Sequence, residues 1–211
     1  MKISEKYADY ILEETKKLLE IDSPSGYTKN VAEYVMEEYH KLGYKADMTI
    51  KGGVLVDLGG EDESNAVMLD THIDTLGGMV SEIKADGNLR IVPIGGLNAN
   101  NTEAENVRVV TRDGKIYTGV FQLDNASVHV NKEYSEKKRS FACMEVLLDE
   151  MVSTKDDTRK LGIDVGDIVC FDPRTVITPS GYIKSRFLDD KLSVGIPVSY
   201  THLRAHETLR H

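Results

Sequence analysis

The sequence has few cysteines, no basic patch and no long apolar run. Cys143 and Cys170 are too few for a disulfide scaffold and form no Cys-x-x-Cys pattern, which predicts a reducing compartment. The net charge of −9 argues against nucleic acid or an anionic membrane as a partner. No window approaches the roughly 18 apolar residues of a membrane span, and the charged N-terminus has no signal-peptide core. We therefore expect a cytoplasmic protein.

The composition is that of an ordinary soluble globular protein. Hydrophobic residues make up 40% of the chain and charged residues 29%. With 211 residues, the chain can form one large domain or two small ones and can bury a hydrophobic core.

The N-terminal third predicts helices followed by strands. Apolar residues at three- and four-residue spacings indicate helices over Ser4–Glu20 and Thr28–Leu42, separated by the helix-breaking cluster Asp22–Gly26. Strands are expected near Tyr44–Ile50 and Val54–Leu58.

Polar residues follow a short apolar run in the next segment. Ala66–Leu69 predicts a strand buried on both faces, and Asp70, His72 and Asp74 follow it. Ligands bind at such strand ends in open α/β sheets. Alternation along an extended backbone places His72 and Asp74 on the same side, so one could bind a metal while the other orients it. The alternative is a strand end with a structural histidine.

The middle of the chain predicts a β-rich domain. Asp86-Gly-Asn88 and Asp113-Gly-Lys115 are hairpin signals. The expected strands are Met79–Ile83, Leu89–Pro93, Val107–Thr111, Ile116–Phe121 and Val165–Phe171, with a helix over Ser153–Leu161. They favour a small antiparallel barrel or sandwich. We expect residues 79–178 to form a domain inserted into an α/β domain of residues 1–78 and 179–196.

Two adjacent carboxylates, Asp189 and Asp190, follow an extended, half-apolar run near the C-terminus. Adjacent like charges cost free energy unless a cation or a helix N-terminus neutralises them. A solvated turn or a helix cap would explain the pair without any chemistry. Its combination with the His-x-Asp pattern favours a metal site.

Several motifs, in the same order along the chain, carry a family resemblance. The sequence resembles the dinuclear metallo-aminopeptidases of the tetrahedral-shell type, which include glutamyl and deblocking aminopeptidases. The matching motifs are Ser23-Pro-Ser-Gly26, Thr71-His-Ile-Asp-Thr-Leu-Gly77, Pro93-Ile-Gly-Gly96, Val165-Gly-Asp167, Phe171-Asp-Pro-Arg174 and Ser185-Arg-Phe-Leu-Asp-Asp-Lys191. The resemblance implies a zinc-exopeptidase-like α/β catalytic domain with an inserted small β-barrel or PDZ-like domain.

The resemblance also implies a site. His72 would be a terminal metal ligand, Asp74 the catalytic carboxylate that orients it, and Asp189 the bridge between two divalent ions, zinc or cobalt. A water bridging the metals would hydrolyse N-terminal residues from short peptides. Lys191 stands where the family has Arg or Lys. Thr75 stands where many members have Glu, which leaves the substrate preference open.

The C-terminal end departs from the family. Val198–Thr208 is the one-frame translation of a transposase adapter used in short-read sequencing, so we expect residues 197–211 to be a non-native tail. The family's general-base glutamate, its remaining ligands and a late histidine lie further downstream and have no counterpart here. We therefore expect the chain as written to be inactive, to bind metal weakly and to aggregate through an unpaired sheet edge.

The parent protein is expected, from the resemblance, to form dimers that assemble into a dodecameric shell. A related co-catalytic zinc exopeptidase or deacylase is one alternative, although its insertion would be helical or ferredoxin-like. A non-catalytic assembly module of the same family is another. Glycoside hydrolysis has little support, because no pair of acids at a defined separation is apparent.

Overall fold

The computed structural model describes residues 3–60 and 62–208. The chain divides into two compact units: residues 1–75 with 173–211, called unit 1, and residues 76–172, called unit 2. Unit 1 contains helices and short strands, and unit 2 is a small closed barrel. The expected α/β architecture with a small β-barrel is confirmed.

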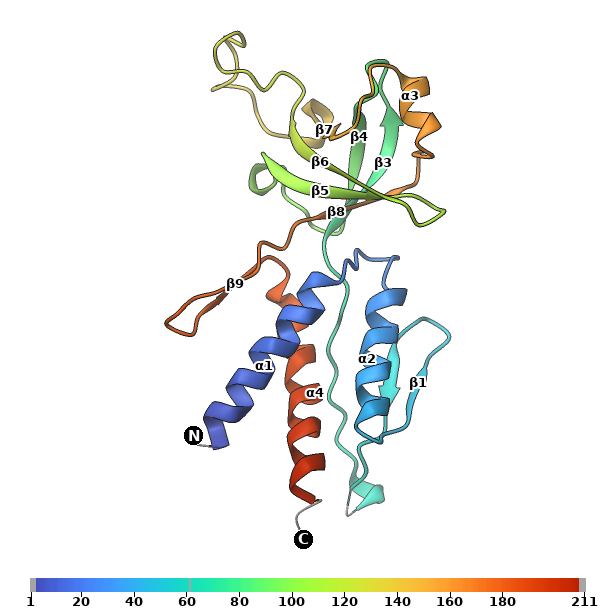
Figure 1. The fold of residues 1–211 in the computed structure, drawn as a ribbon, viewed down its shortest axis with the longest axis vertical. Coiled ribbons are helices and arrows are strands. Elements are labelled where there is room, and N and C mark those ends of the chain that lie inside the picture. The colour runs from blue at the N-terminus through green and yellow to red at the C-terminus, as the bar shows by residue number, and fades with distance from the viewer. Residues whose placement is uncertain (1–2, 61, 209–211) are drawn as a thin grey trace. The chain divides into compact units, whose positions relative to one another are not determined.

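Unit 1 is built from helices and hairpins (Figure 1). Its elements are α1 (Ile3–Glu20), α2 (Lys29–Lys41), β1 (Ala46–Met48), β2 (Val54–Val56), β9 (Val176–Ile177), β10 (Ile183–Lys184) and α4 (Leu188–Thr208). β1 pairs antiparallel with β2, and β9 pairs antiparallel with β10. Both N-terminal helices and the first hairpin are confirmed, although the strands are shorter than expected.

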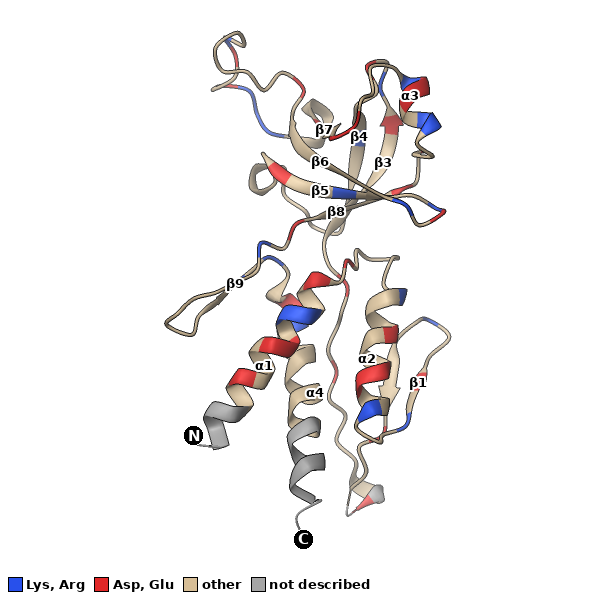
Figure 2. Ribbon diagram, viewed as in Figure 1, with Lys and Arg blue, Asp and Glu red and all other residues tan. Residues whose placement is uncertain are grey.

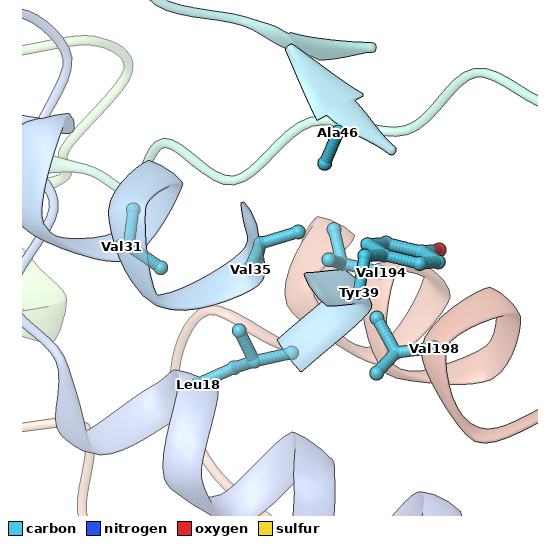
Figure 3. Packing of buried hydrophobic residues seen from close by; sticks show 7 residues of the cluster. All are labelled: Leu18, Val31, Val35, Tyr39, Ala46, Val194 and Val198. Carbon is cyan, nitrogen blue, oxygen red and sulfur yellow. The ribbon is translucent and has the colours of Figure 1, made fainter. Parts of the chain in front are cut away.

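The core of unit 1 lies where α1, α2 and α4 meet (Figure 3). Its buried residues are Leu18, Val31, Val35, Tyr39, Ala46, Val194 and Val198. A side chain at Gly195 would place its Cβ 2.6 Å from Thr15 Oγ1, so glycine permits the close approach of α4 to α1. Val198 belongs to the expected tail, and helix α4 continues through it to Thr208. Residues 209–211 of that tail lie outside the described residues.

The strand expected at Ala66–Leu69 does not form. These residues pair with no other described segment, and Val67, Met68 and Leu69 are 85%, 79% and 71% exposed. A strand is stable only when a neighbouring backbone satisfies its N–H and C=O groups and other side chains cover its faces. The β1–β2 hairpin offers this segment neither, so the prediction of a strand buried on both faces was wrong.

Unit 2 is a closed six-stranded barrel with the strand order β3-β4-β7-β6-β5-β8. The strands are β3 (Gly77–Ile83), β4 (Leu89–Ile94), β5 (Glu105–Val110), β6 (Ile116–Leu123), β7 (Met144–Leu148) and β8 (Ile168–Phe171). Both expected hairpins are present, because β3 pairs antiparallel with β4 and β5 with β6. The barrel prediction is confirmed.

Aromatic and aliphatic side chains fill the barrel. Phe121 and Phe171 are buried and meet edge to face, with their ring centroids 5.5 Å apart. The short helix α3 (Lys155–Lys160) covers one hairpin turn, where the Thr158 hydroxyl donates to the Gly87 carbonyl at 2.7 Å. This hydrogen bond joins α3 to the backbone of the β3–β4 turn.

Charges of both signs are distributed along the chain (Figure 2). Acidic residues lie along α1 and α2 with lysines between them. Within the described residues, none of the helices combines the length and apolar character needed to cross a membrane.

Candidate metal-binding and catalytic site

Backbone hydrogen bonds fix the segment that carries His72 and Asp74. Pro24 and Thr75 form a parallel bridge, in which the Thr75 N–H donates to the Ser23 carbonyl at 2.8 Å. The Ser25 N–H donates to the Thr75 carbonyl at 3.2 Å, and the buried Ser23 hydroxyl donates to the Ile73 carbonyl at 2.9 Å. The Ser-Pro-Ser turn after α1 therefore holds the extended segment that ends at Thr75.

The three sequence-predicted site residues come together in unit 1. His72 Nδ1 lies 3.1 Å from Asp74 Oδ1, and His72 Nε2 lies 3.2 Å from Asp189 Oδ1. The contact with Asp74 is the one expected from the His-x-Asp alternation. The contact with Asp189 joins residues 117 positions apart in sequence.

The carboxylate pair stands at the start of α4. Asp189 and Asp190 have non-helical backbone angles, and the peptide bond between them is cis. The Asp190 carboxylate accepts a hydrogen bond from the backbone N–H of His72 at 3.4 Å. Both adjacent acids therefore face the His72 segment. The next residue, Lys191, is buried and donates to carbonyls at the end of α1.

The electrostatics of the site centre on His72, whose side chain is 55% exposed. Partial desolvation lowers the pKa of His72, but the charge of Asp74, the hydrogen bond to Asp189 and the charge of Asp190 outweigh it. The net effect raises the pKa of His72 above 6.5. The imidazole is thus held among acids that would otherwise repel one another.

We expect this histidine to titrate above its ordinary pKa in the metal-free chain. Its protonated form stabilises the fold below the unfolded pKa, and that contribution is lost as the pH rises through the folded pKa. An NMR titration of the His72 ring protons measures the value. Asp74→Asn should lower the pKa, whereas Asp47→Asn, on β1 in the same unit, should leave it unchanged. A pKa at or below 6.5 would contradict the geometry.

The donors present fit one side of a metal site. Two ligands of one tetrahedral ion, each about 2 Å from it, lie about 3.3 Å apart, close to the 3.2 Å between His72 Nε2 and Asp189 Oδ1. Imidazole and carboxylate also suit zinc. Among the described residues, however, no group of three or more His, Cys, Asp or Glu side chains is arranged to hold an ion. Within the described residues, the arrangement therefore offers two neighbouring donor atoms, His72 Nε2 and Asp189 Oδ1.

Sequence reasoning missed the roles of two residues at this site. Ser25 donates a hydrogen bond from its hydroxyl to Asp74 Oδ2, and Asp190 contacts the His72 backbone. Ser25 belongs to one matched motif and Asp190 to another. Membership of these motifs was the available signal, but a motif does not say which atoms a residue contacts.

Comparisons with known proteins agree on one family. A sequence model described as M42 glutamyl aminopeptidase matches residues 52–210. The protein YhfE of Bacillus subtilis is 45% identical over 191 residues, covering 90% of this chain and 55% of YhfE. The chain spans about half the length of the curated relatives it matches.

Solved structures share the fold. The aminopeptidase APDkam598 from the archaeon Desulfurococcus kamchatkensis superposes with a TM-score of 0.82 at 29% identity, covering 93% of this chain and 52% of that one. A TET1 peptidase of Pyrococcus horikoshii, described as assembling into a tetrahedron or a large octahedral shell, has a TM-score of 0.77 at 24% identity. That match covers 93% of this chain and 57% of the peptidase.

Proposed function

The chain belongs to the M42 glutamyl aminopeptidase family, and we propose from this premise that it is part of a metal-dependent aminopeptidase acting on short peptides. One observation carries the proposal. The imidazole of His72 lies between Asp74 and Asp189, whose carboxylates come from distant parts of the sequence. Exposed acids converge on an exposed histidine at little benefit to stability, so the arrangement favours a ligand-binding role.

Each residue has a proposed role. His72 and Asp189 would hold a divalent ion, and Asp189 would bridge to a second one. Asp74 would orient the imidazole through Nδ1. Two such ions, zinc or cobalt, would supply an acidified water and a polarised carbonyl when bound. The chain's own contribution is to keep Nε2 of His72 and Oδ1 of Asp189 next to each other.

The general base and the remaining ligands would come from the part of the protein that this chain does not cover. The family resemblance places a Glu-Glu pair downstream of Asp189, and the matched relatives are about twice as long as the aligned region.

We further propose that residues 197–211 derive from adapter sequence and that the full-length protein is a cytoplasmic homo-oligomer with a shell-like assembly. A clean read of the source locus that still encodes Tyr200–Arg204 would disprove the adapter origin.

The decisive experiment is to recover the full-length gene and assay its product. We expect a Glu-Glu pair within a few dozen residues of Asp189 and metal-dependent release of N-terminal residues from short peptides. A purified full-length protein that carries metal but cleaves no peptide from a panel of N-terminal residues would contradict the proposal.

The 211-residue chain itself should bind metal weakly. Two ligands cannot close a tetrahedral site, so dialysis against zinc should leave less than one ion per chain. Elemental analysis measures the content, with the His72→Ala variant as the matched control for non-specific uptake. Tight, stoichiometric zinc that disappears in His72→Ala would show that the site is complete after all.

A second candidate function is a non-catalytic assembly module. The full-length sequence distinguishes the two readings, because a module would lack the downstream Glu-Glu pair.

A further inference from the structure

The end of α1 and the turn after it, residues 18–25, contact the segment that carries His72. The buried Ser23 hydroxyl donates to the Ile73 carbonyl at 2.9 Å, and the Thr75 N–H donates to the Ser23 carbonyl at 2.8 Å. These hydrogen bonds hold the backbone next to His72. Residues 18–25, called the α1 platform, therefore support this half of the candidate site.

The α1 platform also holds the start of α4. Lys191 Nζ donates to the carbonyls of Leu18 and Ile21 at 2.7 Å each, and the side chain of Lys191 is 1% exposed. Lysine side chains near the C-terminal end of a helix can hydrogen-bond its last carbonyls. Lys191 therefore joins α4 to the α1 platform two residues after Asp189.

A lysine is an unusual choice here if packing is its only role. The helices α1 and α4 otherwise meet through apolar side chains such as Leu18, Val194 and Val198 (Figure 3). A buried amine costs free energy unless acceptors satisfy its N–H groups, and an apolar side chain would fill the space without that cost. The best-attested role of a buried polar group is to fix one register between packed elements. Lys191 thus sets where α4 begins relative to the end of α1.

Asp189 depends on this register because its side chain is almost fully exposed. The exposed fraction is 95%, and the backbone of Asp189 and Asp190 is non-helical, so regular helix begins only after the pair. Nevertheless, Asp189 Oδ1 lies 3.2 Å from His72 Nε2, a separation that suits two ligands of one ion. A shift of α4 along α1 would change this distance directly.

We propose that Lys191 is a positioning residue that fixes the distance between the segments carrying His72 and Asp189, because it joins α4 to the α1 platform that also holds the His72 segment. The inference rests on the proposed function for its purpose, but its first test does not. Lys191 acts through the backbone carbonyls of α1.

NMR of the metal-free chain is the first test. Nuclear Overhauser cross-peaks between protons of His72 and the β-protons of Asp189 and Asp190 report whether the two segments lie together, and the His72→Gln spectrum assigns them. We expect these cross-peaks in the unaltered chain, and we expect a folded Lys191→Met chain to lose them. Their persistence in folded Lys191→Met, or their absence from the unaltered chain, would overturn the proposal.

Matched variants separate positioning from a general loss of stability. Lys191→Arg keeps the donors and should retain the cross-peaks. Val194→Ala leaves a cavity in the same α1–α4 core, so it destabilises unit 1 without removing the lysine, and it should also retain them. Loss of the cross-peaks in folded Val194→Ala would refute a specific role for Lys191. If Lys191→Met does not fold, Lys191→Gln, which is too short to reach both carbonyls, replaces it and is judged by the same criterion.

Zinc affinity of the full-length protein separates this inference from the proposed function. Lys191→Met should weaken the affinity roughly tenfold, as for other residues that orient metal ligands, and Lys191→Arg should restore most of it. Val194→Ala should leave it unchanged. Loss of the cross-peaks in Lys191→Met, with an unaltered full-length protein that cleaves no peptide, would refute only the proposed function. Peptidase activity with unchanged cross-peaks and zinc affinity in Lys191→Met would refute only the positioning role.

Discussion

Replacing Lys191 by methionine is expected to lower the free energy of unfolding of unit 1 by about 2 to 3 kcal/mol. Lys191 is 1% exposed, and its Nζ donates to the carbonyls of Leu18 and Ile21 at 2.7 Å each. These carbonyls lie at the C-terminal end of α1, where backbone acceptors have no partner within the helix. Methionine keeps the length of the side chain but donates nothing, so both carbonyls would lose this donor, and Leu18 would keep the Ile21 N–H at 3.3 Å.

Chemical denaturation followed by amide NMR signals measures this loss unit by unit. Lys17→Met, on α1 in the same unit, is the matched control, because Lys17 is half exposed and its 3.3 Å ion pair with Glu14 should contribute less than about 1 kcal/mol. Lys191→Arg keeps the charge and the donors and should retain part of the stability. Equal effects of Lys191→Met and Lys17→Met would refute the anchoring role.

Replacing Asp189 by asparagine in the full-length protein is expected to reduce kcat/KM at least about 10³-fold, which corresponds to a loss of several kcal/mol of transition-state stabilisation. The amide keeps the shape of the carboxylate but removes the negative charge that would separate two dications. Because Asp189 is 95% exposed, the substitution should hardly change stability.

Steady-state kinetics together with the metal content check this expectation. Asp156→Asn, in the first turn of α3, is a matched control far along the chain from the site and should retain normal kinetics. Less than a tenfold loss for Asp189→Asn, with full metal content, would remove Asp189 from the proposed ligand set.

The sequence was most informative where structure is local. Turn-forming triplets such as Asp86-Gly-Asn88 fix hairpin positions through backbone angles that few residues adopt, and the barrel strands follow from them. The helices follow from the three- and four-residue spacing of apolar residues, which is also local information. Ala66–Leu69 failed because its composition describes a buried strand, but burial depends on partners that the local sequence does not contain.

The candidate site shows the same division between contacts that are local in sequence and contacts that depend on the folded chain. His72 and Asp74 could be paired from their spacing alone, whereas the contact with Asp189 required either the family resemblance or the folded chain. Ser25 contacts the Asp74 carboxylate and Lys191 contacts backbone carbonyls, and tertiary structure brings each pair together. No residue pattern specifies such contacts in advance, so their roles emerged only from the geometry.

The antiparallel pairing of β3 with β8 has a consequence for assembling the site. The barrel is entered through β3 and left through β8, and Gly78 is paired with Val169. His72 and Asp189 are 117 residues apart in sequence. Once the barrel has folded, the flexible chain between them consists of the connections 72–78 and 169–189, because Gly78 and Val169 are already paired. The entropic cost of closing that loop falls by about 1 kcal/mol, so the folded barrel favours the encounter of the segments that carry His72 and Asp189.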